Sequence, residues 1–139
     1  MSYKIIGKYI KELSFNIPNP KTFFLLSKDI SNYKINIDIK SSQIKQNIIE
    51  VYTTLSLNPI KDGFEKIDTK IIFSTIIELD SNEINKEEME KIILVKVPEK
   101  IYSELRQIFI FLFENSGFKD VKINKTVDFD KLYNLRNVQ

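Results

Sequence analysis

The chain has 139 residues, 42% of them apolar and 29% charged, and a net charge of +2, a composition that indicates one folded domain and excludes a disordered protein. Lysines are spread along the whole chain among acidic residues, so we expect no nucleic-acid partner. The longest apolar run, Ile108 to Phe113, is far shorter than the roughly 20 residues that span a membrane, and no apolar run at the N-terminus indicates a signal peptide. We therefore expect a single cytoplasmic domain over residues 1–139, without membrane insertion.

The first predicted element is a strand. Its apolar residues fall mainly on odd positions, the period of a strand with one buried face: Tyr3, Ile5, Tyr9, Leu13 and Phe15. Pro18 and Pro20 end this strand, because a proline has no amide donor and restricts the residue before it. The next stretch, Phe23 to Ser31, follows neither period and is expected to be an irregular crossing segment.

Three further strands are predicted from the same alternation of apolar and polar residues. They lie at Tyr33–Lys40, Ile49–Leu57 and Ile67–Leu79, and the second of these is closed by Pro59 and a turn around Lys61-Asp62-Gly63. Consecutive strands on short connections favour an antiparallel sheet with one face in water.

The second half of the chain changes to the helical period. Asn85 is predicted to cap a helix three residues before Glu88, and Pro98 to end the next segment and lie near the start of a second helix. Gly117 is the expected end of that helix. Asp128 is expected to cap a last helical turn, Phe129 to Leu135. Strands first and helices second predict an α+β fold, a four-stranded antiparallel sheet with C-terminal helices packed on one face.

The second helix is apolar around most of its circumference. Its inner stripe runs from Ile101 to Phe113, and Ile110 and Phe111 extend the apolar surface to the sides. A helix of this kind is buried on more than one side. In so small a domain the second burial partner is expected to be another subunit or a bound peptide.

No arrangement typical of an active site is found. The chain has neither cysteine nor histidine, which removes the common nucleophilic triads, thiolate metal ligands and the usual general base. Three isolated glycines cannot form a phosphate-binding loop, so we expect no cofactor. We interpret the pair Asp128 and Asp130 as a helix cap and a neighbouring acidic residue, not as a catalytic pair of carboxylates. The protein is therefore not expected to be an enzyme.

Six segments of the chain resemble, in order and spacing, those of one family. They are Tyr9–Pro20 (YIKELSFNIPNP), Lys34–Asp38, Ile49–Val51, Val97-Pro98 followed by Arg106, Gly117-Phe118, and Val127–Tyr133 (VDFDKLY). They are similar to the corresponding segments of the SecB protein-export chaperones, and the similarity spans nearly the whole chain.

The resemblance implies a homotetramer, a dimer of dimers, that acts as an ATP-independent holdase. Such proteins bind unfolded precursor proteins in apolar grooves between sheet and helix and deliver them to the motor SecA. By position, the leading candidates for client contact are Ile35, Ile37 and Ile39, followed by Phe109, Phe113, Leu132 and Tyr133.

The resemblance also implies SecA contacts on the outer surface of the sheet, through Glu12 and Asp68. The chain departs from the family pattern there, because Asn16 and Lys70 stand where the family has acidic residues. Two other functions stay open. One is a SecB-like chaperone dedicated to one client, for example linked to a toxin–antitoxin pair, without SecA coupling. The other is a structural oligomer that is not a chaperone.

Overall fold

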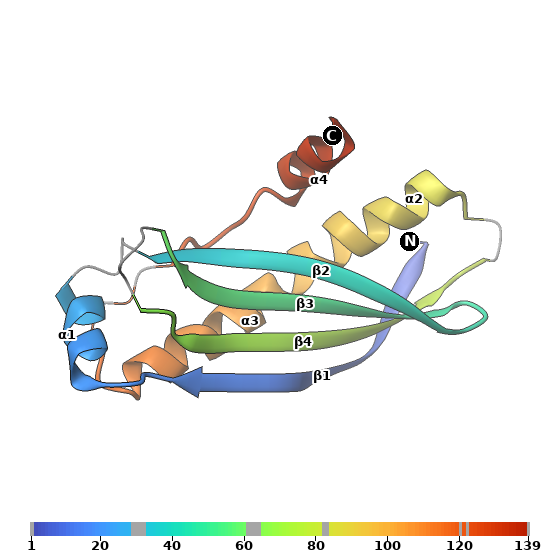
Figure 1. Ribbon diagram of the computed structural model, residues 1–139. Coiled ribbons are helices and arrows are strands. Elements are labelled where there is room, and N and C mark those ends of the chain that lie inside the picture. The colour runs from blue at the N-terminus through green and yellow to red at the C-terminus, as the bar shows by residue number, and fades with distance from the viewer. Residues whose placement is uncertain are drawn as a thin grey trace.

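The computed structural model describes residues 2–28, 33–60, 65–81, 84–119, 121 and 123–138, with side chains to residue 135. The strands β1 (Tyr3–Asn16), β2 (Tyr33–Lys45), β3 (Ile48–Pro59) and β4 (Asp68–Leu79) form a four-stranded antiparallel sheet in the order β1-β4-β3-β2. Helix α3 (Val97–Glu114) runs along one face of this sheet, as Figure 1 shows. The predicted α+β fold, with helices on one face, is confirmed. The predicted turn around Lys61-Asp62-Gly63 lies outside the described residues.

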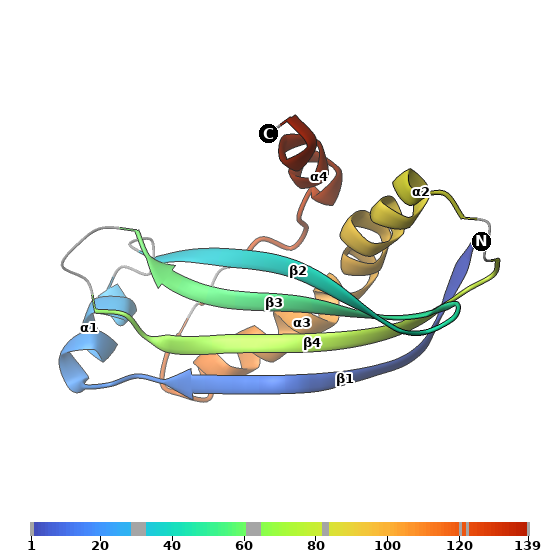
Figure 2. The same cartoon turned by 45° about the vertical axis from the view of Figure 1, so that its right-hand side comes forward.

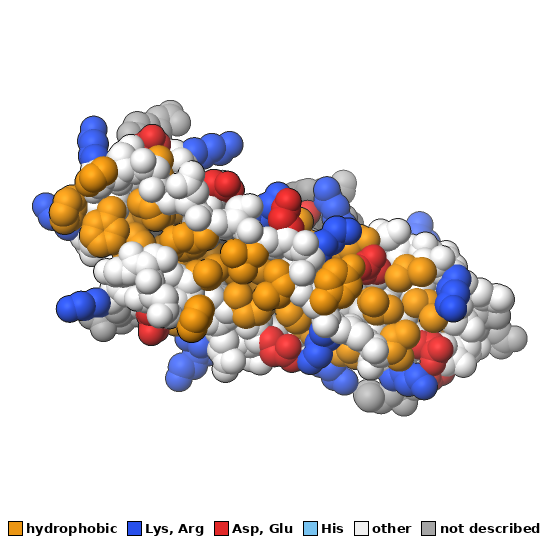
Figure 3. Space-filling view, turned by 90° about the horizontal axis from the view of Figure 1, so that it is seen from below, with side chains coloured by type: hydrophobic (Ala, Val, Ile, Leu, Met, Phe, Trp, Pro, Cys, Tyr) orange, Lys and Arg blue, Asp and Glu red, His pale blue; other side chains and the backbone are white. Residues whose placement is uncertain are grey.

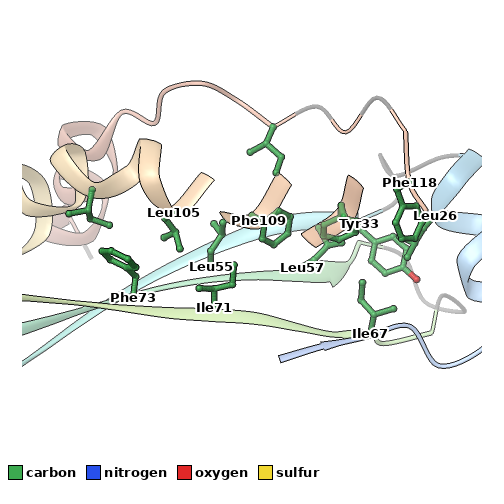
Figure 4. Close-up of a cluster of buried hydrophobic side chains, with 13 residues drawn as sticks. Leu26, Tyr33, Leu55, Leu57, Ile67, Ile71, Phe73, Leu105, Phe109 and Phe118 are labelled. Atoms are coloured by element: carbon green, nitrogen blue, oxygen red, sulfur yellow. The ribbon is translucent and has the colours of Figure 1, made fainter. Parts of the chain in front are cut away.

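The core lies between α3 and the central strands. Along β3 and β4 nearly every second residue is buried, as the alternation of the sequence predicts. Figure 4 shows Leu55, Ile71 and Phe73 of the sheet facing Leu105 and Phe109 of α3. Phe109 is fully buried, and burying a side chain of this size stabilises the fold by about 1.5–3 kcal/mol.

β1 differs from its predicted pattern, because it contains two β-bulges, between Ile5 and Gly7 and between Ile10 and Glu12. Each bulge adds one residue and moves the following side chains to the opposite face. Tyr9 therefore pairs with Ser74 on the outer face of the sheet, away from α3, and the prediction that it faces the core is wrong.

The stretch after β1 was predicted to be irregular but forms the helix α1 (Pro20–Lys28) over most of its length. Asn19 caps it, since its Oδ1 accepts a hydrogen bond from the amide of Thr22 at 2.8 Å. Pro20 is well suited to the start of a helix, where its missing donor costs nothing. The start signal was present in the sequence, and the apolar residues that follow do not form a clear helical stripe.

The C-terminal helical segments are more continuous than the sequence indicates. The helix α2 (Lys86–Lys91) passes through a π-helical segment, η2 (Ile92–Lys96), directly into α3, and Figure 2 shows one unbroken ribbon. Pro98 lies in the first turn of α3, as predicted, without ending the helix before it. In η2 the amide of Val97 bonds the carbonyl of Ile92, five residues back, and this wider turn precedes the proline.

The predicted helix ends are confirmed. The Oδ1 atom of Asn85 accepts a hydrogen bond from the amide of Glu88 at 2.8 Å, and α3 ends before Gly117, which has a φ of 101°. After an extended segment, Asp128 caps the last helix, α4 (Phe129–Val138). Within the described residues, no helix is long and apolar enough to cross a membrane.

Candidate functional site

A groove lies between the edge strand β2 and the C-terminal segment of the chain. In Figure 1, α4 and the extended segment before it lie beyond the free edge of β2. Two hollows follow this edge, of about 370 Å³ and about 170 Å³. Both are lined by Ile37 from β2 and Leu132 from α4, so they form one continuous groove. The remaining apolar lining of the groove is contributed by Ile35, Ile39, Leu94, Tyr102, Ile123, Val127 and Tyr133.

Two side chains of α3 fix the extended segment that forms the far wall. The hydroxyl of Tyr102 donates to the carbonyl oxygen of Asn124 at 2.7 Å, and Nε of Arg106 donates to the carbonyl oxygen of Ile123 at 3.1 Å. Burial raises the pKa of Tyr102, so its hydroxyl keeps the proton that it donates. The wall is therefore attached to the helix by side chains, without a strand ladder.

α4 is packed over the end of the groove by two aromatic side chains. Phe129 and Tyr133 are buried in a small cluster with Val95 and Tyr102, separate from the main core. The hydroxyl of Tyr133 also donates to Oε2 of Glu90 at 3.2 Å. The adjacent Leu132 is left 46% exposed and lines both hollows, so an apolar side chain faces the open groove.

The structure brings together five of the seven side chains predicted to contact a client. Ile35, Ile37 and Ile39 are partly buried along β2, and Leu132 and Tyr133 meet them from α4. The other two, Phe109 and Phe113, are 0% exposed in the main core and do not line the groove, because they are on the face of α3 that packs on the sheet.

Sequence reasoning missed the far wall of the groove and the residues that hold it. Tyr102, Ile123 and Val127 line the groove and were not predicted there. A signal was available, because Arg106 belongs to a matched segment of the resemblance and anchors this wall. The extended segment itself has no period that would distinguish it from a surface loop.

The chemistry of the groove is that of an apolar binding surface. Its walls are isoleucine, leucine, valine and tyrosine side chains, with Lys34 and Asp38 at the rim. No cluster of acidic residues that could hold a metal ion occurs in the described part of the chain. Such a groove can take up apolar side chains of an extended segment, and the edge of β2 adds backbone donors and acceptors beside them.

On the outer face of the sheet, the two acidic residues predicted to contact SecA are kept apart. Glu12 forms an ion pair with Lys70 at 3.0 Å, and Asp68 pairs in register with Asn16 at the end of the sheet. Lys70 lies between them on the same face of β4, so the two carboxylates do not form a continuous acidic surface.

The outer face instead has a hydrogen-bonded network around Glu50. Its carboxylate accepts hydrogen bonds from the hydroxyls of Ser74, Tyr52 and Tyr9, which together lower its pKa to about 2. The ammonium of Lys11 lies 4.3 Å from the centre of the Tyr52 ring. This network joins β1, β3 and β4 and keeps Glu50 charged.

A second apolar surface lies along β1 and α3. Figure 3 shows a strip of apolar side chains that extends over most of the length of the molecule. β1 contributes the exposed side chains of Ile6, Ile10 and Leu13, and α3 contributes Phe111, which is 64% exposed. Phe111 lies seven residues after Glu104 and so on the same side of the helix, and an ion pair of 2.5 Å joins Glu104 to Lys8 of β1.

The comparisons with known proteins agree on one family. The family model described as "Preprotein translocase subunit SecB" matches residues 1–139. A Pelagibacter ubique protein, provisionally named protein-export protein SecB, is 42% identical over 97% of this chain and 96% of that protein. The protein-export protein SecB of Rhodospirillum rubrum is 29% identical over 95% of this chain and 80% of that protein.

A solved structure has a similar fold. A SecB-like chaperone of Mycobacterium tuberculosis, in complex with a peptide from the HigA1 antitoxin, matches 88% of this chain and 90% of its own with a TM-score of 0.60. The sequence identity is 10%, so this likeness concerns the fold.

Proposed function

Because the chain belongs to the SecB family, a family of protein-export chaperones and not of enzymes, we propose that it acts as an ATP-independent holdase in the cytoplasm. In this proposal it binds unfolded precursor proteins in the groove between β2 and α4 and delivers them to SecA. The observation that carries the proposal is the groove itself, an apolar channel beside a free strand edge, lined by Ile37 and Leu132.

The groove suits clients of many sequences. Burial of apolar area contributes roughly 25 cal/mol per Å² without regard to direction, so any apolar side chain can fill the hollows. Alternate side chains of an extended segment point to one side, and the backbone of the β2 edge can pair with the backbone of such a segment. Neither contribution needs a nucleotide.

Delivery to SecA is the finer part of the proposal. It is supported by the names of the relatives, which are protein-export proteins, and Glu12 and Asp68 remain the proposed SecA contacts. A dedicated client is the second candidate, because the M. tuberculosis protein of similar fold is bound to an antitoxin peptide. Association of the purified chain with SecA decides between them, and no detectable binding would contradict the export function.

A homotetramer is proposed on the strength of the apolar strip. A monomeric soluble protein seldom exposes a continuous apolar surface of this kind, so the strip along β1 and Phe111 is expected to be covered by a second copy of the chain. β1 is also the second free edge of the sheet, which pairing between copies would protect. A dimer of dimers would then bring four grooves into one particle.

The central test is suppression of aggregation. A chemically unfolded protein is diluted into buffer with substoichiometric tetramer and no nucleotide, and light scattering is recorded. Scattering is expected to fall in proportion to the tetramer added, and Leu132→Asp is expected to remove most of this protection. If the unaltered chain gives no protection, the chain is better described as a structural oligomer than as a chaperone.

A further inference from the structure

The hydrogen-bond pattern of the sheet determines which backbone groups of the edge strand β2 face the groove. In an antiparallel pair, opposite residues that exchange two hydrogen bonds alternate with opposite residues that exchange none. The register of β3 with β4, extended by one residue, places Asn47 opposite Leu79, and the amide of Leu79 donates to the carbonyl oxygen of Asn47 at 2.7 Å. This register has no shift, so Leu55 and Ile71, an even number of residues further on, are also a bonded pair.

The same alternation continues into β2. Leu55 directs its amide and carbonyl toward β4, so it exchanges no hydrogen bonds with Ile37, its opposite residue on β2. Ile35 and Ile39 are opposite residues of the same series of β3. Pro59 supports this assignment, since it belongs to that series and has no amide to donate. The N–H and C=O groups of the three isoleucines are therefore directed at the free edge, and within the described residues they have no backbone partner.

The side chains of the same three residues line the groove. Ile35, Ile37 and Ile39 contribute to the two hollows and alternate along β2 with Asn36 and Asp38, whose side chains are directed toward the other face of the sheet. Each isoleucine thus offers a backbone donor, a backbone acceptor and an apolar side chain on the groove side of one strand edge.

We propose, as a refinement that rests on the client binding proposed above, that the groove selects segments in which three apolar residues alternate with polar ones. Such a segment is bound as a fifth, antiparallel strand beside β2. Each of its apolar residues lies opposite Ile35, Ile37 or Ile39, exchanges two hydrogen bonds with that residue, and directs its own side chain into the groove. A parallel strand lacks this property, because the residues that bond the isoleucines would then have their side chains on the opposite face.

The groove has room for one added strand and not for the sheet of a second copy of the chain. The distance along β2 from Ile35 to Ile39 is about 13 Å at about 3.3 Å per residue, which five extended residues span. On the side away from β2 the groove is bounded by Ile123, Val127 and Leu132, and Figure 1 shows this part of the chain beyond the edge of the sheet. The wall would obstruct direct pairing of β2 with β2 of another copy.

The test uses the full-length chain and labelled synthetic peptides of alternating leucine and serine, with a lysine at each end for solubility. One peptide is unmodified, one has N-methyl groups on three leucines, and one has them on three serines. Only the leucine amides would face β2, so we expect leucine methylation to weaken binding at least tenfold and serine methylation to change it little. The two methylated peptides are matched in composition and number of methyl groups.

A fourth peptide tests the spacing of the apolar residues. It has the same composition, with its leucines three and four positions apart as on one face of a helix, and should bind at least tenfold more weakly than the unmodified peptide. Leu132→Asp should weaken binding of the unmodified peptide, which would locate that peptide in the groove.

Four results would each overturn the strand addition: no binding of the unmodified peptide, no effect of Leu132→Asp, a loss on leucine methylation no greater than on serine methylation, or equal binding of the fourth peptide. Binding of a chemically unfolded protein to the same preparation is measured in parallel. If that protein binds while one of these results is obtained, only the strand addition fails. If it does not bind, the proposed client binding fails as well.

Discussion

The hydroxyl of Tyr102 on α3 donates to the carbonyl oxygen of Asn124 at 2.7 Å, and this bond joins the long helix to the far wall of the groove. The same ring lies 6.1 Å from that of Phe129, in an edge-on arrangement, so Tyr102 also contacts the first residue of α4. One side chain therefore positions both parts of the chain that face β2.

Tyr102→Phe is expected to loosen this wall. The change keeps the ring contact with Phe129 and removes one hydrogen bond from a buried hydroxyl, at a cost of about 1 kcal/mol in the free energy of unfolding. Amide hydrogen exchange in α4 should become faster than in the unaltered chain. Tyr33→Phe is the control, because it removes a similar bond of 2.8 Å to the carbonyl of Glu65, away from the groove. Equal exchange in α4 for both variants would contradict the assigned role.

The elements that could be predicted are those whose periodicity reflects local burial. β3 and β4 alternate because one face of each packs under α3, and Asn85, Gly117 and Asp128 act within a few residues of their own positions. These features depend on interactions that are close in sequence or on a single continuous core.

The features that could not be predicted depend on distant partners. The bulge that turns Tyr9 outward is defined only by the register against β4. A regular alternation of apolar and polar residues does not indicate where an extra residue is inserted in the strand. The far wall of the groove is held by Tyr102 and Arg106, seventeen or more positions earlier in the chain. On β2, by contrast, alternation alone indicated the correct face for Ile35, Ile37 and Ile39.

Ile37→Asp is expected to weaken client binding with little effect on folding. Ile37 is only partly buried and lines both hollows of the groove, so a carboxylate there would oppose the burial of apolar client side chains. A loss of at least tenfold in affinity for a fluorescently labelled unfolded protein is expected. Gln43→Asp, at an exposed position on the same strand, has the same charge change and should bind normally.

Leu132→Asp separates binding from folding in that experiment. Leu132 is nearly half exposed, so its replacement should leave the thermal midpoint close to that of the unaltered chain while reducing client affinity. If Ile37→Asp unfolds the chain and Leu132→Asp binds clients normally, the groove is not the client site.

Phe111→Asp is expected to disrupt the oligomer. The side chain is 64% exposed on the apolar strip, so the change costs little in the folded subunit but places a charge in the proposed subunit contact. Native mass spectrometry should give about four times 16.4 kDa for the unaltered chain and smaller species for the variant. Leu135→Asp is the control, because it replaces a similarly exposed apolar residue on α4. This variant should remain tetrameric. A monomer for the unaltered chain would contradict the proposed assembly.

Glu50→Gln should make the outer face less stable in a pH-dependent manner. The folded-state pKa of Glu50 is lowered to about 2 from 4.5, so its hydrogen bonds stabilise the fold fully above pH 4.5, and this stabilisation is lost as the pH falls toward 2. At pH 7 the free energy of unfolding of the variant should be lower by roughly 1.5–3 kcal/mol, the contribution typical of hydrogen bonds to a charged group. Urea unfolding at one protomer concentration, repeated at pH 7, 4 and 3, should show this difference shrinking as the pH falls.

Glu114→Gln, which replaces an exposed carboxylate at the end of α3, is the control and is expected to show no such trend. A difference for Glu50→Gln that is the same at every pH would mean that the network does not depend on the charge of Glu50.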